Sequence, residues 1–447
     1  MTDTAGYDCD VLISADFVLA SAPPEAGVSG HHVIEDAALA VSAGRVGTVG
    51  RRGELANLRA KRRLELGRSL VLPGLVNAHT HIAMTFLRGW ADDLPLAEWL
   101  TQHIFVKERQ LTAEIVELGA LIGCAELIRT GCTAFADMYL FEDAVAAAAD
   151  RAGLRCLLGE AIFAFATPAS VSAEQAMDRV RGLAERFTGH SRLRVAVMPH
   201  SVYTTDDAIL RSCLRLADEL GLPLHLHVAE TAREAEDCRR AHGKGPVAYC
   251  RDLGLLRPTT TLIHCVVPDE EELDMIAASG AHVAHNPRSN MKLASGVAPV
   301  PAMLRRGILP GLGTDGAASN NALNMFAEMN ACALLHKGHS RDPTLCPAAT
   351  VLDMATTGSA AALCWPELGR IFPGGPADLV ALDLRSPNLL PLYSPFSHLA
   401  YAASGFEVRL SMADGRILYE DGAFTTLDIP QLCDEAEKLK QWVLKTV

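Results

Sequence analysis

The sequence predicts an α/β protein with a (β/α)8 TIM-like barrel and a small β-sandwich domain built from both termini. One pattern predicts the barrel: eight short apolar, β-rich segments alternate with helical stretches over roughly 250 to 300 residues, the usual span of this fold. Alternating strand-like runs at both ends of the chain predict the sandwich. The composition agrees, because 447 residues of which 49% are hydrophobic can bury a large core.

The expected barrel strands are residues 71–77, 133–138, 154–159, 193–198, 224–229, 261–264, 281–285 and 309–314. Between the first two, Thr112 is a candidate N-cap for a segment with apolar residues at helical spacing, which ends at Gly131. A second helical segment covers residues 205–220 and ends at Gly221. In such a barrel the active site lies at the C-terminal ends of the strands.

The two flanks carry alternating runs that are typical of strands. Residues 9–50 contain CDVLISADFVLA and ALAVSAGRVGTVG, and the tail contains ADLVALDL and VRLSMADGRILYEDG, in which Asp414 and Gly415 form a turn signal. Neither flank is long enough for a domain by itself, so we expect them to associate. The predicted division is 1–70 for the N-terminal part of the sandwich, 71–368 for the barrel and 369–447 for the C-terminal part.

Charge and composition exclude several classes of protein. The chain has 40 Lys and Arg against 53 Asp and Glu, and the net charge of −13 argues against a nucleic-acid partner. The acidic start lacks the features of a secretory signal, and no apolar run approaches the roughly 20 residues of a membrane span. We therefore expect a soluble, cytoplasmic protein. The twelve cysteines form no C-x-x-C pair, which predicts buried apolar thiols rather than disulfides or a thiolate metal site.

A pair of histidines, His79 and His81, follows the first barrel strand. Side chains alternate along a strand, so this H-x-H pair sends both imidazoles to the same side, which in a barrel is the interior mouth. Neutral imidazoles are good ligands for zinc or iron, and two of them make half a site. The alternative is a pair of core or surface histidines without metal.

Further polar side chains follow later strands. His225 and His227 share one face of the fifth strand, with His227 nearer the mouth, and Glu230 follows where a carboxylate is well placed for proton transfer. His264 ends the sixth strand, and Asp315 ends the eighth before a run of small residues that lets a substrate approach closely. The alternatives are an exposed acid for Glu230 and a helix N-cap for Asp315.

The order H-x-H, His, His, Asp on the first, fifth, sixth and eighth strands resembles the amidohydrolase superfamily of metal-dependent hydrolases. The segments GLVNAHTHIAMTFLRGWADDLPLAEWL, HNPRSNMKLASG and GTDGAASNN are similar to those of the subgroup that deaminates 5'-methylthioadenosine and S-adenosylhomocysteine. This resemblance covers nearly the whole chain. It implies one divalent metal ion per subunit, Zn²⁺ with Fe²⁺ or Mn²⁺ as alternatives, held by His79, His81, His227 and Asp315.

The resemblance also implies roles in catalysis. A bound zinc ion lowers the pKa of water to roughly 7, which supplies hydroxide at neutral pH for attack on C6 of adenine. Glu230 is expected to protonate the neighbouring ring nitrogen and Asp315 to carry a proton from the attacking water to the leaving amine, while both also contact the substrate. His264 is expected to orient the hydroxide.

Four further residues are expected to bind the nucleoside. The resemblance implies that Glu108 binds the ribose hydroxyls, with a solvated acid as the alternative, and that His200, at the end of the fourth strand, contacts the substrate. Trp99 is expected to cover the purine or the 5' group, with a structural tryptophan as the alternative, and Ser319 is a further candidate contact.

One departure from the subgroup bears on the substrate. Some members hold the amino-acid carboxylate of S-adenosylhomocysteine with arginines after the third strand, whereas here no arginine lies between Arg155 and Arg179. This favours a neutral 5' group, as in 5'-methylthioadenosine, 5'-deoxyadenosine or adenosine. The alternatives are a related hydrolase acting on guanine, cytosine or a triazine, and a non-catalytic structural relative.

The remaining expectations concern other histidines and assembly. We expect His282 and His285 to be structural, and His336 and His339, in the polar segment LLHKGHSRD, to be solvated. The subgroup resemblance implies a homo-oligomer, a dimer or a tetramer. The expected partner is a small-molecule nucleoside, with no nucleic acid and no membrane.

Overall fold

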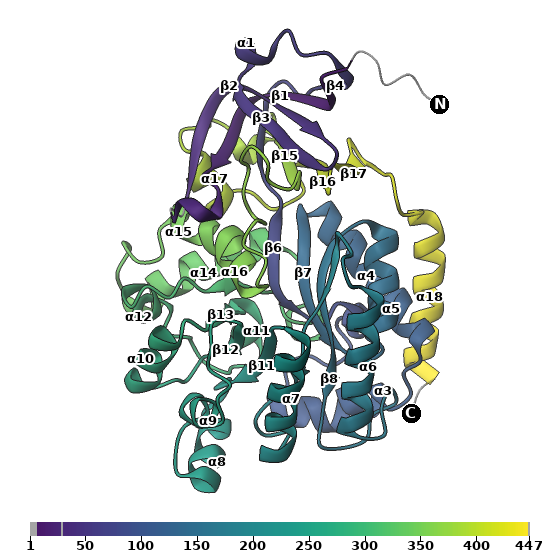
Figure 1. Cartoon of the computed structure of the whole chain (residues 1–447), viewed down its shortest axis with the longest axis vertical. Helices are drawn as coiled ribbons and strands as arrows, with labels where there is room; N and C mark the ends of the chain where they lie inside the picture. Colours follow the sequence, from purple (N-terminus) through teal and green to yellow (C-terminus); the bar gives the residue numbers. More distant parts are fainter. Residues whose placement is uncertain (1–6, 28–29, 446–447) are drawn as a thin grey trace.

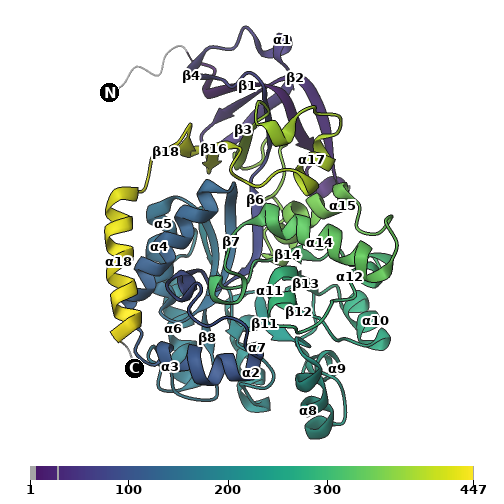
Figure 2. The same cartoon turned by 180° about the vertical axis from the view of Figure 1, so that it is seen from behind.

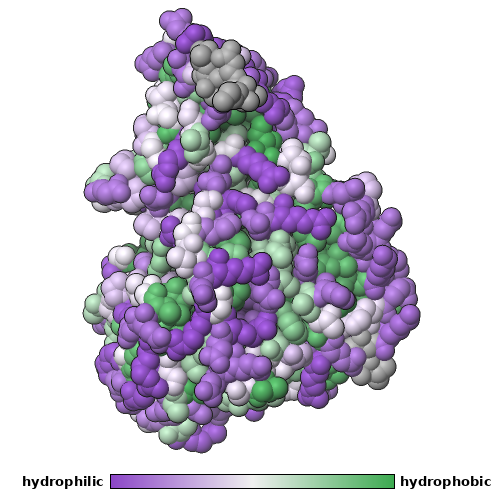
Figure 3. Space-filling model, turned by 45° about the vertical axis from the view of Figure 1, so that its right-hand side comes forward, coloured by the Kyte–Doolittle hydropathy of each residue, from purple (hydrophilic) through white to green (hydrophobic). Residues whose placement is uncertain are grey.

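The computed structural model describes residues 7–27 and 30–445, so the first six residues, on which the prediction of no secretory signal partly depends, lie outside it. A mostly antiparallel nine-stranded sheet lies at one end of the molecule, and two parallel sheets with helices around them form the rest (Figure 1). None of the described helices is long and apolar enough to cross a membrane. On the face seen in Figure 3, hydrophilic side chains predominate and separate small apolar patches.

The two parallel sheets close into the predicted barrel. One contains β6 (Leu75–Thr80), β7 (Cys132–Tyr139), β8 (Arg155–Ile162), β9 (Leu193–Val195) and β10 (Met198–Pro199), and the other contains β11 (Leu224–Val228), β12 (Thr260–His264), β13 (His282–His285) and β14 (Gly311–Leu312). The amide of His225 donates to the carbonyl of Val197 at 3.1 Å, and the amide of Asp315 donates to the carbonyl of His79 at 3.0 Å. These two backbone bonds join the sheets at both seams, and the prediction of a (β/α)8 barrel is confirmed.

Three strand predictions differ from the structure, and one of them, 193–198, is divided into β9 and β10. The expected strand 71–77 is divided at Gly74, because β5 (Ser69–Pro73) belongs to the terminal sheet and only β6 enters the barrel. A Cβ atom at Gly74 would lie 2.0 Å from the Thr133 hydroxyl, so the chain passes there only without a side chain. The expected strand 309–314 is reduced to the two residues of β14.

Helices surround the barrel, and the short elements after β6 cover its mouth. The barrel helices are α4 (Ala113–Arg129), α5 (Glu142–Ala152), α6 (Ala173–Arg186), α7 (Asp207–Leu220), α8 (Ala232–His242), α9 (Pro246–Asp252), α10 (Glu270–Ser279), α11 (Pro287–Lys292), α12 (Val300–Arg305), α13 (Ala317–Asn320), α14 (Met325–Ser340), α15 (Ala348–Asp353), η4 (Met354–Gly358) and α16 (Ser359–Ala362). After β6 come η2 (Ile82–Leu87), α2 (Leu96–Glu98), η3 (Trp99–Ile104) and α3 (Phe105–Glu108). Thr112 caps α4 as predicted, accepting from the amide of Ile115 at 3.4 Å, and Gly221 ends α7 in the left-handed conformation.

Both flanks supply the nine-stranded sheet. Its strands are β1 (Cys9–Ser21), β2 (His31–Ser42), β3 (Arg45–Arg51), β4 (Ala60–Glu65), β5, β15 (Leu379–Asp383), β16 (Val408–Ala413), β17 (Arg416–Glu420) and β18 (Ala423–Phe424), with η1 (Pro24–Ala26), α1 (Arg52–Leu55), η5 (Pro387–Leu389) and α17 (Pro395–Tyr401) between them. Antiparallel pairing of β5 with β15 joins the two halves, and Asp414 and Gly415 form the predicted turn between β16 and β17. The two termini therefore combine into one β-rich unit with its own apolar core.

Two features show how this unit meets the barrel. The buried guanidinium of Arg155, at the start of β8, donates to Asp378 at 2.7 Å and to Asp414 at 2.9 Å, which fixes the sheet to the N-terminal end of the barrel. The last helix, α18 (Ile429–Lys445), packs on α4 of the barrel rather than on the sheet (Figures 1 and 2). The predicted division of the chain at residues 70 and 368 stays a prediction.

Candidate metal centre and active site

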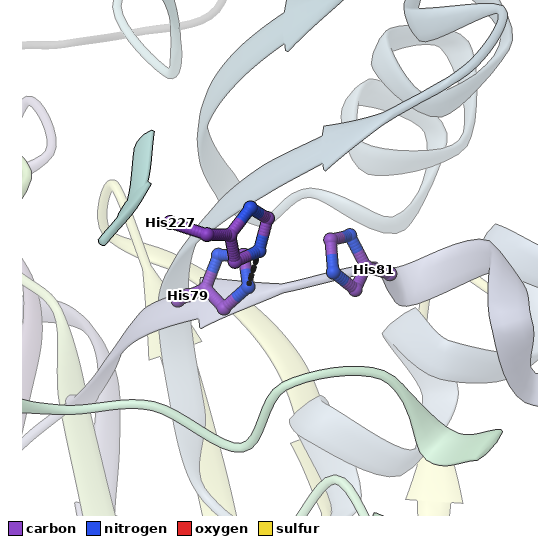
Figure 4. A group of neighbouring side chains, drawn as sticks. All are labelled: His79, His81 and His227. Atoms are coloured by element: carbon purple, nitrogen blue, oxygen red, sulfur yellow. Dashed lines mark hydrogen bonds between the residues drawn. The ribbon is translucent and has the colours of Figure 1, made fainter. Parts of the chain in front are cut away.

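Four side chains from three places in the barrel converge at its mouth. The Nε2 atoms of His79 and His227 are 3.2 Å apart, and Oδ1 of Asp315 lies 3.5 Å from Nε2 of His79 and 3.3 Å from Nε2 of His81. Figure 4 shows the three imidazoles turned toward one another from β6 and β11. These separations suit ligand atoms that share one divalent ion at bonds of about 2.0 to 2.2 Å. The predicted ligand set therefore fits a divalent metal.

Backbone carbonyls orient two of these imidazoles. The Nδ1–H of His81 donates to the carbonyl of Met138, and that of His227 donates to the carbonyl of His200 at 2.6 Å. These bonds fix the proton on Nδ1, so that the lone pair of Nε2 points to the centre of the group. Burial lowers the pKa of His79 to about 4 and that of His227 well below its usual value, and both imidazoles are neutral, as metal ligands must be.

The carboxylate of Asp315 is held by neighbouring donors. Its Oδ2 accepts from the hydroxyls of Ser289 at 2.6 Å and Ser319 at 2.8 Å, and its Oδ1 accepts from the amide of Gly316 at 2.9 Å. Burial opposes the negative charge, but the bond to His79 and the surrounding imidazoles outweigh it and hold the pKa of Asp315 well below its usual value. Asp315 is thus an ionised carboxylate, and the hydrogen-bond donors around it offset the cost of burying its charge.

His264 presents a ring proton to the cavity. Its Nδ1 accepts from the side-chain amides of Asn290 at 3.0 Å and Asn286 at 3.2 Å, so the proton of the neutral ring is on Nε2. That Nε2 lies 3.8 Å from Oε2 of Glu230. The backbone of His264 has a φ of +74°, a strained conformation that aims the ring inward at the end of β12.

Glu230 lies in a turn just beyond β11 that its neighbour Glu234 stabilises. The Glu234 carboxylate accepts from the amides of Ala229 at 2.8 Å and Glu230 at 2.7 Å. Burial, and then the charge of Asp315, raise the pKa of Glu230 to about 8. In the metal-free protein this side chain holds a proton at neutral pH, which is the form that a general acid requires.

A cavity with about 640 Å³ of empty space, partly open to solvent, adjoins these groups. Of the predicted substrate contacts, Glu108, Trp99 and His200 line it, as do Glu230 and Asp315. Burial raises the pKa of Glu108, although its Oε1 accepts a hydrogen bond from the Tyr139 hydroxyl at 2.7 Å.

Ser319 is placed differently from the other predicted substrate contacts. Its side chain is 2% exposed, lies outside the set of residues that line the cavity and donates to Asp315. This placement favours a role in holding Asp315 over the predicted contact with the substrate.

Several functional residues were missed from the sequence. Phe163 stacks on the His200 ring with centroids 4.5 Å apart, and Tyr139 and Tyr203 also line the cavity. The amide pair Asn286 and Asn290 was detectable, since both lie in the HNPRSN segment that carries the family resemblance, but no role was assigned to them. None of the described residues that line the cavity is a lysine or an arginine.

A (β/α)8 barrel with three imidazoles and a carboxylate at its strand ends defines a metal-dependent hydrolase. The model of the Amidohydrolase family matches residues 70–418, and the chain belongs to this family.

Proteins similar to this chain indicate which reaction within the Amidohydrolase family is relevant. A protein of Nitratidesulfovibrio vulgaris named 5-methylthioadenosine/S-adenosylhomocysteine deaminase is 56% identical over 437 residues, or 98% of each chain. A protein of Methanothermobacter thermautotrophicus named 5'-deoxyadenosine deaminase is 45% identical over 82% of this chain and 86% of its own. The crystal structure of an adenosine deaminase from Xanthomonas campestris with bound zinc has a TM-score of 0.93 and 36% identity, covering 98% of this chain and 99% of its own. The resemblance found in the sequence is confirmed.

Proposed function

We propose that this protein is a hydrolase that deaminates adenine nucleosides, converting them to the inosine analogues with release of ammonia. The observation that carries the proposal is geometric: the buried Glu230 carboxyl group lines the same cavity as His81, His227 and Asp315, at the mouth of the barrel. Relatives that cover 98% and 82% of the chain are named as deaminases of such nucleosides. A related activity on guanine, cytosine or a triazine is disfavoured, because these named relatives act on adenine nucleosides.

The side chains divide the chemistry between them. His79, His81, His227 and Asp315 would hold a divalent ion, which we propose to be Zn²⁺, and such an ion would lower the pKa of water to about 7 and so supply a nucleophile at neutral pH. Glu230 donates its proton to the ring nitrogen next to C6, and the Nε2–H of His264 orients the attacking oxygen. Asp315, ionised at neutral pH, accepts a proton from the attacking water and delivers it to the departing amine. The second proton of the water leaves the oxygen at C6 as ammonia departs and returns to the Glu230 carboxylate, which restores the acid.

The cavity walls bind the nucleoside. Glu108, held by the Tyr139 hydroxyl, accepts hydrogen bonds from the ribose hydroxyls. The His200 ring, stacked on Phe163, contacts the nucleoside, and Trp99 covers it.

The same walls indicate a neutral 5' substituent. The segment after β6 contributes several apolar side chains to the cavity wall, namely Leu96, Leu100, Ile104 and Phe105. A free carboxylate there would lose its hydration without gaining a guanidinium or ammonium partner from the described lining residues. We therefore propose 5'-methylthioadenosine, 5'-deoxyadenosine or adenosine as better substrates than S-adenosylhomocysteine.

Ammonia release from a panel of purine nucleosides tests both the proposed deaminase activity and the proposed preference for a neutral 5' substituent. We expect turnover of adenine nucleosides only, and kcat/KM higher for 5'-methylthioadenosine than for S-adenosylhomocysteine. Turnover of guanine or a triazine in place of the nucleosides would refute the proposed function. A preference for S-adenosylhomocysteine would refute only the proposed 5' specificity. The identity of the metal, the homo-oligomeric state and the cytoplasmic location stay predictions.

A further inference from the structure

A second group of metal-ligand side chains lies outside the catalytic site. His285 ends β13, while Cys332 and His336 lie four residues apart on α14 and share the helix face that packs toward this strand. The Nε2 atoms of His285 and His336 are 3.3 Å apart, and one ligand atom from each of the three residues lies within 4.8 Å of the others. All three side chains are buried, so the prediction that His336 is solvated is wrong.

Cys346 stands next to this group. Its thiol interacts with the thiol of Cys332, and the Lys337 ammonium donates to the carbonyls of Leu345 at 2.5 Å and of Cys346 itself at 2.8 Å. The interaction with Cys332, together with the charge of Lys337, lowers the pKa of the Cys346 thiol despite its burial. The loop thus brings a second sulfur next to Cys332.

We propose that His285, Cys332, His336 and Cys346 form a second, structural metal site for Zn²⁺ or a similar thiophilic divalent ion. Two nitrogens bound tetrahedrally to one zinc ion at 2.0 to 2.1 Å are about 3.3 Å apart, which is the separation observed here. Three ligand atoms already lie close together, and Cys346, whose thiol interacts with that of Cys332, would supply the fourth ligand and close the coordination, as in structural zinc sites. The site is distinct from the catalytic group, whose ligands include no sulfur.

Such an ion would fix α14 to the barrel behind the catalytic residues. His285 precedes Asn286, which donates to His264, and Glu328 on α14 accepts from Asn320 at 2.7 Å at the end of the loop that carries Asp315. The ion would therefore hold the outer helix against two elements that orient catalytic side chains. This proposal does not depend on the identity of the nucleoside.

Metal content per chain tests the proposal. The full-length protein, purified with its metal under reducing conditions, is expected to contain two ions per chain by elemental analysis, and Cys332→Ala is expected to contain one. The control is Cys213→Ala, which removes an equally buried thiol from α7 and is expected to keep two ions. Release of ammonia by Cys332→Ala shows that the variant is folded and that its catalytic ion is in place.

Cobalt substitution gives a second readout, because only the proposed site contains sulfur ligands. The Co²⁺ form of the wild type and of Cys213→Ala is expected to show intense thiolate-to-cobalt charge-transfer absorption in the near ultraviolet. Cys332→Ala is expected to lose this absorption, and Cys346→Ala is expected to retain about half of its intensity. The Cys346→Ala result keeps the test decisive if Cys332→Ala does not fold. One ion per chain in the wild type without this absorption, or a Cys332–Cys346 disulfide found by mass spectrometry in the same preparation, would overturn the proposal.

Discussion

Replacing Glu230 with glutamine removes the proposed acid while keeping the shape of its side chain. Glu230 is 5% exposed, and its pKa of about 8 lies well above the ordinary value of 4.5. In the folded, metal-free protein the Glu230 side chain therefore keeps its proton between pH 4.5 and 8, whereas in the unfolded chain the same side chain is ionised over this range. Because only the folded state binds the proton in this range, wild-type stability falls as the pH rises.

The expected size follows from about 1.36 kcal/mol for each pH unit. Between pH 5 and pH 8 the wild type should lose of order 4 kcal/mol of unfolding free energy relative to Glu230→Gln, which cannot ionise there. Because Glu230→Gln lacks the proposed general acid, its ammonia release should be reduced by about 10²- to 10⁴-fold. Relative to the wild type, the stability of the variant should increase as the pH rises.

Urea unfolding of the metal-free proteins at several pH values measures this difference, and ammonia release of the metal-loaded forms measures catalysis. The matched control is Glu236→Gln, which removes a carboxylate from an exposed position on the neighbouring helix α8 and should leave catalysis intact. If the free-energy difference between the wild type and Glu230→Gln is constant from pH 5 to pH 8, Glu230 is not the buried, protonated acid described above. A Glu230→Gln enzyme with wild-type turnover would exclude it from catalysis.

Three further outcomes are expected. Ser319→Ala removes one charge-assisted hydrogen bond from Asp315, so kcat should fall about 10- to 100-fold with little change in KM; a rise in KM alone would point instead to direct contact with the nucleoside. Glu108→Gln should lower kcat/KM by a similar factor for ribonucleosides and much less for 2'-deoxy analogues, and equal losses for both would contradict its contact with the ribose. Removal of metal with a chelator should abolish ammonia release and added Zn²⁺ should restore it, with elemental analysis to confirm each state; activity in verified metal-free protein would refute the metal requirement.

Period-two alternation made part of the site visible in the sequence. His225 and His227 are separated by one residue in β11, so their shared face follows from strand geometry. His79 lies in β6 and His81 directly after it, so the same spacing was a useful guide to that pair. Asp315 was placed at the mouth by strand order, although β14 is far shorter than expected. The order of elements was sufficient there, because a barrel collects all of its strand ends at one mouth.

Contacts between distant segments were not visible in the same way. His336 lies in a locally polar stretch, and its burial is decided by β13, which packs against its helix. The hydroxyl of Ser289 donates to Asp315, although the two residues are 26 positions apart in the chain. The raised pKa of Glu230 similarly depends on burial by surrounding elements, which no local pattern encodes.

The pairing of β5 with β15 has a consequence for how the protein is made. The whole barrel sequence lies between these two strands, so during synthesis the N-terminal strands emerge from the ribosome long before β15 exists. The row of hydrogen-bonding groups on β5 is an open edge throughout that interval, able to pair with another nascent chain. Closure of so long a segment is slow compared with local helix formation, so completion of the sheet is the step at which dilution or a chaperone should most improve the yield of folded protein.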